Sequence, residues 1–436
     1  MNAIDLKTLL QKLRKVHCNK FYIKKLAQNN NNKQQIYLGS GFENQHNAVN
    51  LLSYELQQDG GNIYLHGTLD FFWMSSDGLI EKAHDAKLIY YKQYPEVRLS
   101  CFLRGCKLAP RDFLSWEKNK VFPDRILVFG ITPQNRIIAF LAVKPSQVYD
   151  ELLSHCKDHP DDQKGVLYEI KEDDTESLNS KELLLRKIDE ISRKGWIKSQ
   201  TLTKDGIVAC SGNRCVGLTL ESQLGITQNS SAKPDFWGWE LKTLTLKSFS
   251  SRNNKRITII EPQPTGGMYV DDIKKFFSRF GHFDTNNSSR INFNGTFNAN
   301  LTNSKKGLKL ELDGLSSRKD KFDPTGKLLL VSEKGEIAAE WSFLKLREHW
   351  VNKHSKAAFI PALKSKETHS FMYSANLSMG EGTTFLRLLK SLDNGQVFLD
   401  PASWQDEHNK VKHRNMFRIK RFDLPSLYER FETLQS

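Results

Sequence analysis

The 436-residue sequence lacks the features that define several classes of protein. It has no run of about 18 apolar residues, which a membrane-spanning helix requires. The first 15 residues mix Asp5, Lys7 and Lys12 with leucines, unlike the apolar core of a signal peptide. Only six cysteines occur, and none forms a CxxC pair, so zinc fingers and disulfide scaffolds are disfavoured. We therefore expect a cytoplasmic protein in a reducing compartment, with no membrane contact.

Motifs of several enzyme classes are also missing. No GxxxxGK[ST] phosphate loop occurs. Cys210 and Cys215 lack an orienting His/Asp motif, which disfavours covalent nucleophilic catalysis. His349 and His354 are five residues apart in a helix-like stretch, unlike metal ligands, and we expect both to be exposed.

Positive charge is the first feature that is present in excess. The chain has 64 Lys and Arg against 50 Asp and Glu, a net charge of +14. Residues 1–150 carry 20 basic and 13 acidic side chains, residues 151–200 carry 9 and 12, and residues 201–436 carry 35 and 25. Two basic blocks flanking an acidic stretch favour a polyanionic partner such as a nucleic acid, although a generically basic soluble protein is the alternative.

The acidic stretch marks the predicted domain boundary. Residues 158–179 are polar and mostly lack helical periodicity, which predicts a linker between domains 1–157 and 180–436, although residues 166–170 could form a short strand. A helix capped by Ser180 and ended by Gly195 opens the second domain. The first domain is predicted to be a mainly β barrel or sandwich, with strands at 21–26, 35–38, 61–65, 86–91, 98–102, 125–131 and 136–143.

Residues 217–247 carry the most informative pattern. Residues 218–224 suit a short helix, and residues 239–246 alternate as a half-buried strand does, so that Glu240 and Lys242 share one face. Asp235 could bend back toward Glu240 if the chain forms a hairpin or bulge at Gly238. Two carboxylates can hold Mg²⁺, and a lysine can position or deprotonate the water that attacks a phosphodiester. A solvated strand is the alternative, but the surrounding aromatic residues indicate a partly buried site.

This segment resembles the active-site region of PD-(D/E)xK nucleases, and among them the MvaI/BcnI restriction endonucleases and their MutH relatives. The resemblance implies that Asp235 and Glu240 bind the metal, that Lys242 serves the attacking water, and that Glu221 is an accessory catalytic carboxylate. A helix-surface glutamate is the alternative for Glu221. The resemblance also implies an α/β nuclease domain with a mixed central sheet flanked by helices. The matching residues are Leu220-Glu221, Leu224-Gly225-Ile226, Asn229-Ser230, Pro234-Asp235 and Gly238-Trp239-Glu240-Leu241-Lys242-Thr243.

Two C-terminal stretches, 396–400 and 413–419, resemble the recognition region of the same family. An arginine can donate a fork of hydrogen bonds to guanine, and an aspartate can accept from cytosine. A basic segment, 410–421, that contacts only phosphates is the alternative. The resemblance implies DNA contacts by Asp400, His413, Arg414, Asn415 and Arg418.

Residues 21–26, 36–38, 86–91 and 96–100 resemble segments of the EcoRII-like effector domain, a DNA-binding pseudobarrel that grips a second copy of the target with two arms. The arms correspond to residues 29–35 and 92–98. A β domain with ordinary surface lysines is the alternative. The resemblance implies DNA contacts by Lys33, Lys92, Glu96 and Arg98.

Together these resemblances predict a Mg²⁺-dependent type IIE restriction endonuclease. It would cut double-stranded DNA at CC(A/T)GG, with CC(C/G)GG as the next choice, and work beside a cognate DNA methyltransferase. A MutH-like nicking nuclease and a non-catalytic, sequence-specific DNA-binding protein are the alternatives. Whether the active form is a monomer or an assembly of two chains stays open.

Overall fold

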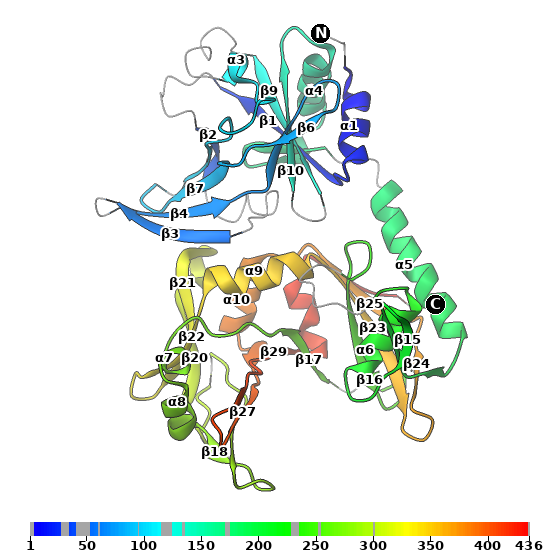
Figure 1. Cartoon of the computed structure of the whole chain (residues 1–436), viewed down its shortest axis with the longest axis vertical. Helices are drawn as coiled ribbons and strands as arrows, with labels where there is room; N and C mark the ends of the chain where they lie inside the picture. Colours follow the sequence, from blue (N-terminus) through cyan, green and yellow to red (C-terminus); the bar gives the residue numbers. More distant parts are fainter. Residues whose placement is uncertain are drawn as a thin grey trace. The chain divides into compact units, whose positions relative to one another are not determined.

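The structure is a computed structural model that describes residues 4–27, 35–40, 53–59, 62–94, 96–114, 124–132, 136–170, 175–227, 235–251, 254–299 and 301–434. The chain forms two compact units, Met1–Glu176 and Ser177–Ser436 (Figure 1). Both units combine helices with a larger number of strands, as the predicted α/β class requires. Within the described ranges, no helix is long and apolar enough to cross a membrane.

Two β-sheets form the framework of the first unit. Its strands are β1 (Lys20–Leu26), β2 (Ile36–Ser40), β3 (Ser53–Asp59), β4 (Asn62–Thr68), β5 (Phe71–Met74), β6 (Ile80–Lys82), β7 (Lys87–Tyr91), β8 (Glu96–Ser100), β9 (Arg125–Ile131), β10 (Ile137–Val143), β11 (Gln163–Lys164) and β12 (Leu167–Glu169). One sheet has the order β11-β12-β1-β9-β10-β5-β6, and the other has the order β2-β8-β7-β4-β3. The predicted mainly β character of this unit is confirmed.

The core of the first unit lies between the larger sheet and two helices. Every residue of β9 is buried, and β9 pairs with β10 in the hairpin predicted from the two apolar runs. Helices α1 (Leu6–Lys15) and α4 (Gln147–Asp158), which the sequence analysis did not identify, bury Leu9, Leu13 and Leu152 against this sheet. Their N-caps are Asp5 and Ser146, whose side chains accept backbone N–H groups of the first turns. A short helix, α3 (Arg111–Leu114), completes the unit.

Part of the predicted linker is folded. A 3-10 turn (Pro160–Asp162) and the β11–β12 hairpin occupy residues 160–169, and β12 pairs antiparallel with β1. The linker prediction is therefore wrong here, because Leu167 and Ile170 are buried against the first sheet. Helix α5 (Thr175–Arg193) also begins five residues before the predicted cap Ser180.

The second unit contains one central mixed sheet and four smaller ones. The central sheet has the order β13-β24-β23-β25-β30, and β16 pairs in parallel with β23. Its strands are β13 (Ile197–Lys198), β16 (Glu240–Leu246), β23 (Lys356–Ser365), β24 (Ser370–Tyr373), β25 (Leu377–Glu381) and β30 (Arg430–Leu434). The smaller sheets are formed by β14 (Gln200–Thr203) and β15 (Gly206–Ala209); β17 (Arg256–Ile260), β29 (Phe417–Lys420) and β26 (Val397–Leu399); β18 (His282–Phe283), β19 (Arg290–Asn294), β27 (Ala402–Asp406) and β28 (Val411–Lys412); and β20 (Leu308–Ser316), β21 (Lys321–Ser332) and β22 (Ile337–Ser342).

Helices cover both faces of the central sheet, as the fold resemblance implies. On one face, α5 and α6 (Cys215–Gln223) pack against Leu241 and Ile360. On the other face, the core includes Leu244 and Phe359 with residues of the remaining helices. These helices are α7 (Met268–Asp271), α8 (Ile273–Phe280), α9 (Phe343–His354) and α10 (Phe385–Asp393).

His354 is buried, contrary to the sequence-based expectation that it is exposed. Its ring stacks on Trp350 with centroids 4.3 Å apart, and its Nε2 lies 2.9 Å from the carbonyl oxygen of Ile259. The prediction failed because tertiary packing, and not the residue's own polarity, determines which face of α9 is covered.

Candidate active site

A tight turn leads into β16 and positions the predicted metal ligands. Phe236 and Trp239 exchange two backbone hydrogen bonds, with N–O distances of 3.0 and 2.8 Å. Between them, Trp237 and Gly238 have φ angles of 44° and 86°. Positive φ at both central residues is typical of a type I′ turn, whose twist matches that of paired strands. The hairpin considered at Gly238 is thus present, and we call residues 235–242 the 235–242 hairpin.

The 235–242 hairpin brings the three predicted catalytic residues together. Asp235 Oδ2 accepts the backbone N–H of Leu241 at 2.9 Å, so its carboxylate lies beside the start of β16. Lys242 Nζ lies 2.7 Å from Glu240 Oε1. The side chain of Glu240 is 3% exposed and that of Lys242 is 24% exposed. Burying a charged carboxylate costs free energy that an ion pair only partly offsets. Glu240 is therefore unlike an ordinary solvated strand residue, and charged groups of this kind are concentrated at functional sites.

The donor set of the hairpin fits a magnesium ion. Among the described residues, no group of three or more His, Cys, Asp or Glu side chains forms a closed metal cage. Mg²⁺ does not require one, since it usually takes one or two carboxylates and completes its shell with waters and substrate phosphates. The carboxylates of Asp235 and Glu240 are such hard oxygen donors, so the residues present are compatible with this metal.

Glu221 lies on α6, on a different side of β16. A Cβ atom placed on Gly217 would lie 3.7 Å from Glu221 Oε1 and 3.8 Å from Thr243 Oγ1, so this glycine leaves room where helix and strand meet. Side chains alternate along a strand, and Thr243 therefore faces away from the side that carries Glu240 and Lys242. The accessory role of Glu221 stays a prediction.

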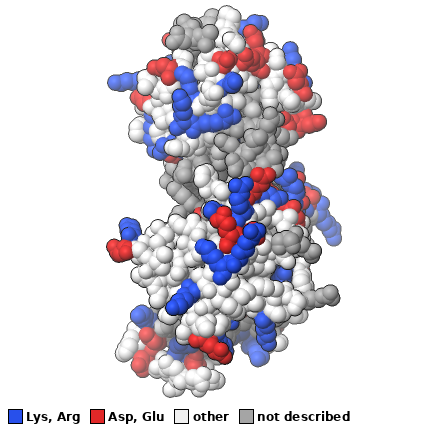
Figure 2. Space-filling view, turned by 90° about the vertical axis from the view of Figure 1, so that its right-hand side faces the viewer, with Lys and Arg blue, Asp and Glu red and all other residues white. Residues whose placement is uncertain are grey.

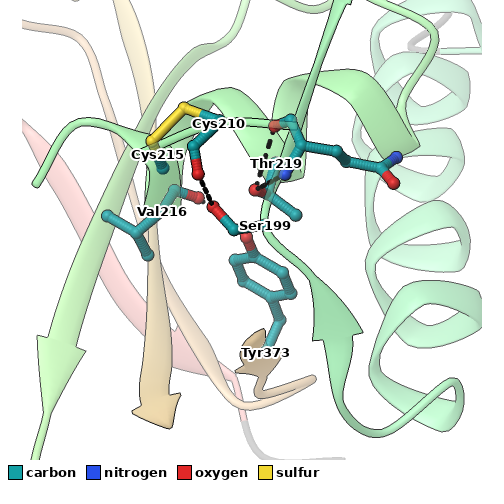
Figure 3. Close-up of a disulfide and its surroundings, with 7 residues drawn as sticks. Ser199, Cys210, Cys215, Val216, Thr219 and Tyr373 are labelled. Carbon is teal, nitrogen blue, oxygen red and sulfur yellow. Dashed lines mark hydrogen bonds between the residues drawn. A yellow bond between two sulfur atoms is a disulfide. The ribbon is translucent and has the colours of Figure 1, made fainter. Parts of the chain in front are cut away.

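Several contacts fix α6 in place (Figure 3). Cys210 and Cys215 form a disulfide at the start of the helix, and Ser199 Oγ donates to the carbonyl of Cys210 at 2.8 Å. Tyr373 Oη donates to the carbonyl of Val216 at 2.7 Å, and burial raises the pKa of this phenol well above its usual value. The disulfide differs from the fully reduced state expected from the cysteine spacing. It forms because folding brings the end of β15 against the N-terminus of α6.

A second group of polar residues surrounds the edges of β17 and β29. We define the β17–β29 polar cluster as Arg256, Thr258, Tyr269, Asp400, His413, Arg414, Asn415 and Arg418. Asp400 Oδ2 accepts from Arg256 NH1 at 3.1 Å and from Arg418 NH1 at 2.9 Å. Arg418 Nε also donates to Thr258 Oγ1 at 3.1 Å. The same oxygen of Asp400 therefore orients two arginines, of which the sequence analysis identified only Arg418.

The remaining predicted contact residues of this cluster have different exposures. His413 and Arg414 are exposed, and Arg414 Nε donates to Glu261 Oε1 at 3.2 Å. Asn415 is only 1% exposed and donates to Gln263 Oε1 and Tyr269 Oη at 3.0 and 3.2 Å. Both amide hydrogens of Asn415 are used inside the protein, and its contact with DNA stays a prediction. The segment 254–269 carries no motif that could have identified Arg256 and Tyr269.

In the first unit, Arg98 lies at the centre of the predicted contact residues. It binds Glu96 Oε2 through Nε and NH2 at 3.0 and 2.6 Å and donates from NH1 to Gln35 Oε1 at 3.2 Å. Its guanidinium also lies 5.4 Å from the ring centre of Tyr91. Lys92 is exposed after β7, whereas Lys33 lies outside the described residues. On the face seen in Figure 2, Lys and Arg side chains gather in the middle of this unit.

Comparisons with known proteins give one sequence family. The model of the MvaI/BcnI restriction endonuclease family matches residues 185–428, more than half of the chain. A solved complex of restriction endonuclease MvaI with its cognate DNA substrate is 20% identical, with a TM-score of 0.44, and the match covers 58% of this chain and 97% of that one. For MvaI in the absence of DNA, the values are 18% identity, a TM-score of 0.33, and coverage of 59% and 98%. A search of curated proteins finds no match. The family match contains both the 235–242 hairpin and the β17–β29 polar cluster.

Proposed function

The chain belongs to the MvaI/BcnI restriction endonuclease family, and from this premise we propose that it is a type II restriction endonuclease of the IIE kind. It hydrolyses phosphodiester bonds of double-stranded DNA at CC(A/T)GG with Mg²⁺. A cognate DNA methyltransferase protects the same sites in the cytoplasm of the host. The observation that carries the proposal is the buried Glu240–Lys242 pair beside Asp235, since this arrangement supplies a metal site and a cation next to it.

Asp235 and Glu240 are the residues that would hold the metal. When bound, Mg²⁺ polarises the scissile phosphate and lowers the pKa of a coordinated water. The two carboxylates supply the hard oxygen ligands, and the N–H of Leu241 fixes the orientation of Asp235. Burial of Glu240 excludes competing water from its carboxylate, which strengthens its interaction with a cation.

Lys242 acts as a proton-bearing cation in this proposal. Its ammonium lies 2.7 Å from Glu240 Oε1, beside the carboxylates that would hold the metal. It therefore donates a hydrogen bond that orients the attacking water and stabilises the negative charge that develops on the phosphate oxygens. As the water oxygen forms its bond to phosphorus and gives up a proton to solvent, the bond from phosphorus to the leaving deoxyribose oxygen breaks, and that oxygen takes a proton from solvent.

The β17–β29 polar cluster is proposed to read the bases. Arg256 and Arg418 share the carboxylate oxygen of Asp400, which directs both guanidinium groups and leaves other N–H donors available for guanine. His413 and Arg414 are exposed beside them. Side chains that distinguish bases, and do not merely contact phosphates, must be held in fixed orientations. The hydrogen bonds to Asp400 hold Arg256 and Arg418 in this way.

The experiment that tests the proposal is a digest of plasmid and phage DNA in Mg²⁺, with EDTA and Lys242→Ala controls, followed by sequencing of the ends. Discrete fragments that share CC(A/T)GG are the expected result. Nicked circles would instead indicate a MutH-like enzyme, and uncut DNA that shifts in a gel would indicate a non-catalytic binding protein.

The first unit is proposed to bind a second copy of the target and to stimulate cleavage. Its support is the Arg98 network with Glu96 on the same strand, Tyr91 on the paired strand β7 and Gln35 just before β2. Arg98→Ala should slow cleavage of DNA that carries one site, while the cut position is unchanged. Lys7→Ala, at an exposed lysine of the same unit, is the control and should leave the rate of cleavage unchanged. Equal rates for wild type and Arg98→Ala on one-site and two-site DNA would remove the effector role.

A further inference from the structure

The buried hydroxyl of Tyr269 contacts two other residues of the β17–β29 polar cluster, His413 and Asn415. The hydroxyl oxygen lies 2.7 Å from Nδ1 of His413 and 3.2 Å from Nδ2 of Asn415. The side chain is 5% exposed, and its ring packs edge-on against Phe276 with centroids 4.8 Å apart. The exposed imidazole of His413 therefore contacts a hydroxyl group whose position is fixed by the packing of the Tyr269 ring in the core.

The hydrogen bonds in this group assign the protons. Asn415 Nδ2 donates one hydrogen to Gln263 Oε1 at 3.0 Å and the other to Tyr269 Oη. Asn415 and Ser403 both hydrogen-bond the Tyr269 hydroxyl, and donation by both would fill its acceptor sites, so we take its own hydrogen to be directed to Nδ1 of His413. An imidazole nitrogen that accepts a hydrogen bond carries no proton. Neutral His413 consequently carries its proton on Nε2, the nitrogen on the other side of the ring.

We infer that Tyr269 fixes His413 in the Nε2–H tautomer and thereby makes it a hydrogen-bond donor toward a base. The inference rests on the proposed function and names a positioning residue for it, since Tyr269 acts through His413. In the major groove, guanine presents two acceptors, N7 and O6, whereas cytosine presents an amino donor. An Nε2–H group therefore selects guanine over cytosine. The opposite tautomer, which offers an acceptor at Nε2, would lose this preference.

The tautomer is measured directly by ¹⁵N spectra of histidine-labelled protein without DNA, with His413 assigned through a His413→Gln variant. The expected wild-type spectrum has an unprotonated Nδ1 and a protonated Nε2 for His413. Tyr269→Phe removes only the hydroxyl, and we expect a mixture of tautomers. The matched control is Tyr22→Phe, which removes another buried hydroxyl, 3.4 Å from Glu169 Oε1, in the first unit. A protonated Nδ1 in the wild type, or the same tautomer ratio in Tyr269→Phe, would overturn the inference.

The consequence for recognition is measured with duplexes in which 7-deaza-dG, which lacks the N7 acceptor, replaces one guanine at a time. At one position we expect wild-type kcat/KM to fall by about tenfold, the effect of one lost hydrogen bond. Tyr269→Phe should lose much of this sensitivity while its melting temperature stays close to that of the control. Adding Tyr269→Phe to His413→Ala should cause no further loss. Losses that multiply in the double variant would contradict the inference, because Tyr269 would then act elsewhere.

These measurements separate failure of the inference from failure of the proposed function. A wild-type protein that cuts no DNA in Mg²⁺ removes the proposed function, and the histidine spectra still decide the tautomer because they need no substrate. A protein that cuts specifically but shows unchanged 7-deaza-dG sensitivity in Tyr269→Phe keeps its function and loses the inference.

Discussion

The 235–242 hairpin and the β17–β29 polar cluster are assembled in opposite ways. In the hairpin, Asp235, Glu240 and Lys242 lie within one turn and the strand that follows it. In the cluster, the pairs Arg256–Asp400 and Tyr269–His413 are each separated by 144 positions. Local backbone geometry is enough to bring the proposed catalytic groups together, whereas the proposed base-reading groups meet only when the whole unit has folded.

This difference has a functional consequence. A hairpin with its own hydrogen bonds holds reacting groups in a geometry that distant substitutions disturb little. In a cluster built from several segments, a mutation can replace one side chain and leave the others in place, because each segment contributes only one or two donors. Cleavage chemistry and sequence preference are therefore expected to respond to different sets of mutations.

The largest effect should come from Lys242→Ala. Loss of the ammonium removes a charge-stabilising donor from the transition state, and we expect cleavage to slow by about 10³-fold. Single-turnover cleavage in Mg²⁺ measures it, with Asp235→Asn as a second variant that keeps the size of the side chain. The matched control is Lys366→Ala, an exposed lysine after the neighbouring strand β23. Wild-type rates in both hairpin variants would show that the reaction occurs elsewhere.

The next effect concerns specificity. Asp400→Ala should leave Arg256 and Arg418 without their shared acceptor, and discrimination against a single base-pair mismatch should fall roughly 10- to 100-fold. Asp400→Asn should have an intermediate effect because it keeps an acceptor but loses the charge. The ratio of kcat/KM for cognate and mismatched duplexes measures this, with the exposed Asp205→Ala as control. An unchanged ratio, with only overall binding weakened, would indicate phosphate contact.

A smaller effect is expected at helix α6, which packs against the 235–242 hairpin. Tyr373→Phe leaves the buried carbonyl of Val216, at the start of α6, without its 2.7 Å donor. The free energy of unfolding should fall by about 1–2 kcal/mol, measured by urea unfolding. Tyr94→Phe, at a site 71% exposed, should have no effect. Equal stability of the two variants would show that another contact holds α6.

The smallest effect should come from the turn of the hairpin. Trp237 adopts a positive φ of 44° while 72% exposed. Left-handed backbone costs a residue with a Cβ about 1–2 kcal/mol, and glycine loses about 0.5–1 kcal/mol through the entropy of the unfolded chain. Trp237→Gly should therefore stabilise the protein by roughly 0.5 kcal/mol. Trp196→Gly, at an exposed tryptophan outside the positive-φ residues, should destabilise it, and thermal melting distinguishes the two.

Sequence patterns predicted the elements whose geometry is local. The alternation over 239–246 matches β16, and the apolar runs at 125–131 and 136–143 match the β9–β10 hairpin. The patterns failed where packing decides: His354 is buried between Trp350 and the Ile259 carbonyl. Helix α1 was missed for a different reason, since Leu6, Leu9, Leu10 and Leu13 do follow helical spacing after the cap Asp5.

For this protein, the sequence by itself predicted the family, which the family match confirms, and it predicted that Asp235, Glu240 and Lys242 lie in one turn and strand, where the structure places them. It could do so because turn and strand preferences act over a few residues. Tertiary structure alone placed Arg256 and Tyr269 beside Asp400 and His413. These contacts depend on how β17 and α7 pack against distant strands, and the free energy of that packing is a property of the whole core, which no short stretch of sequence contains.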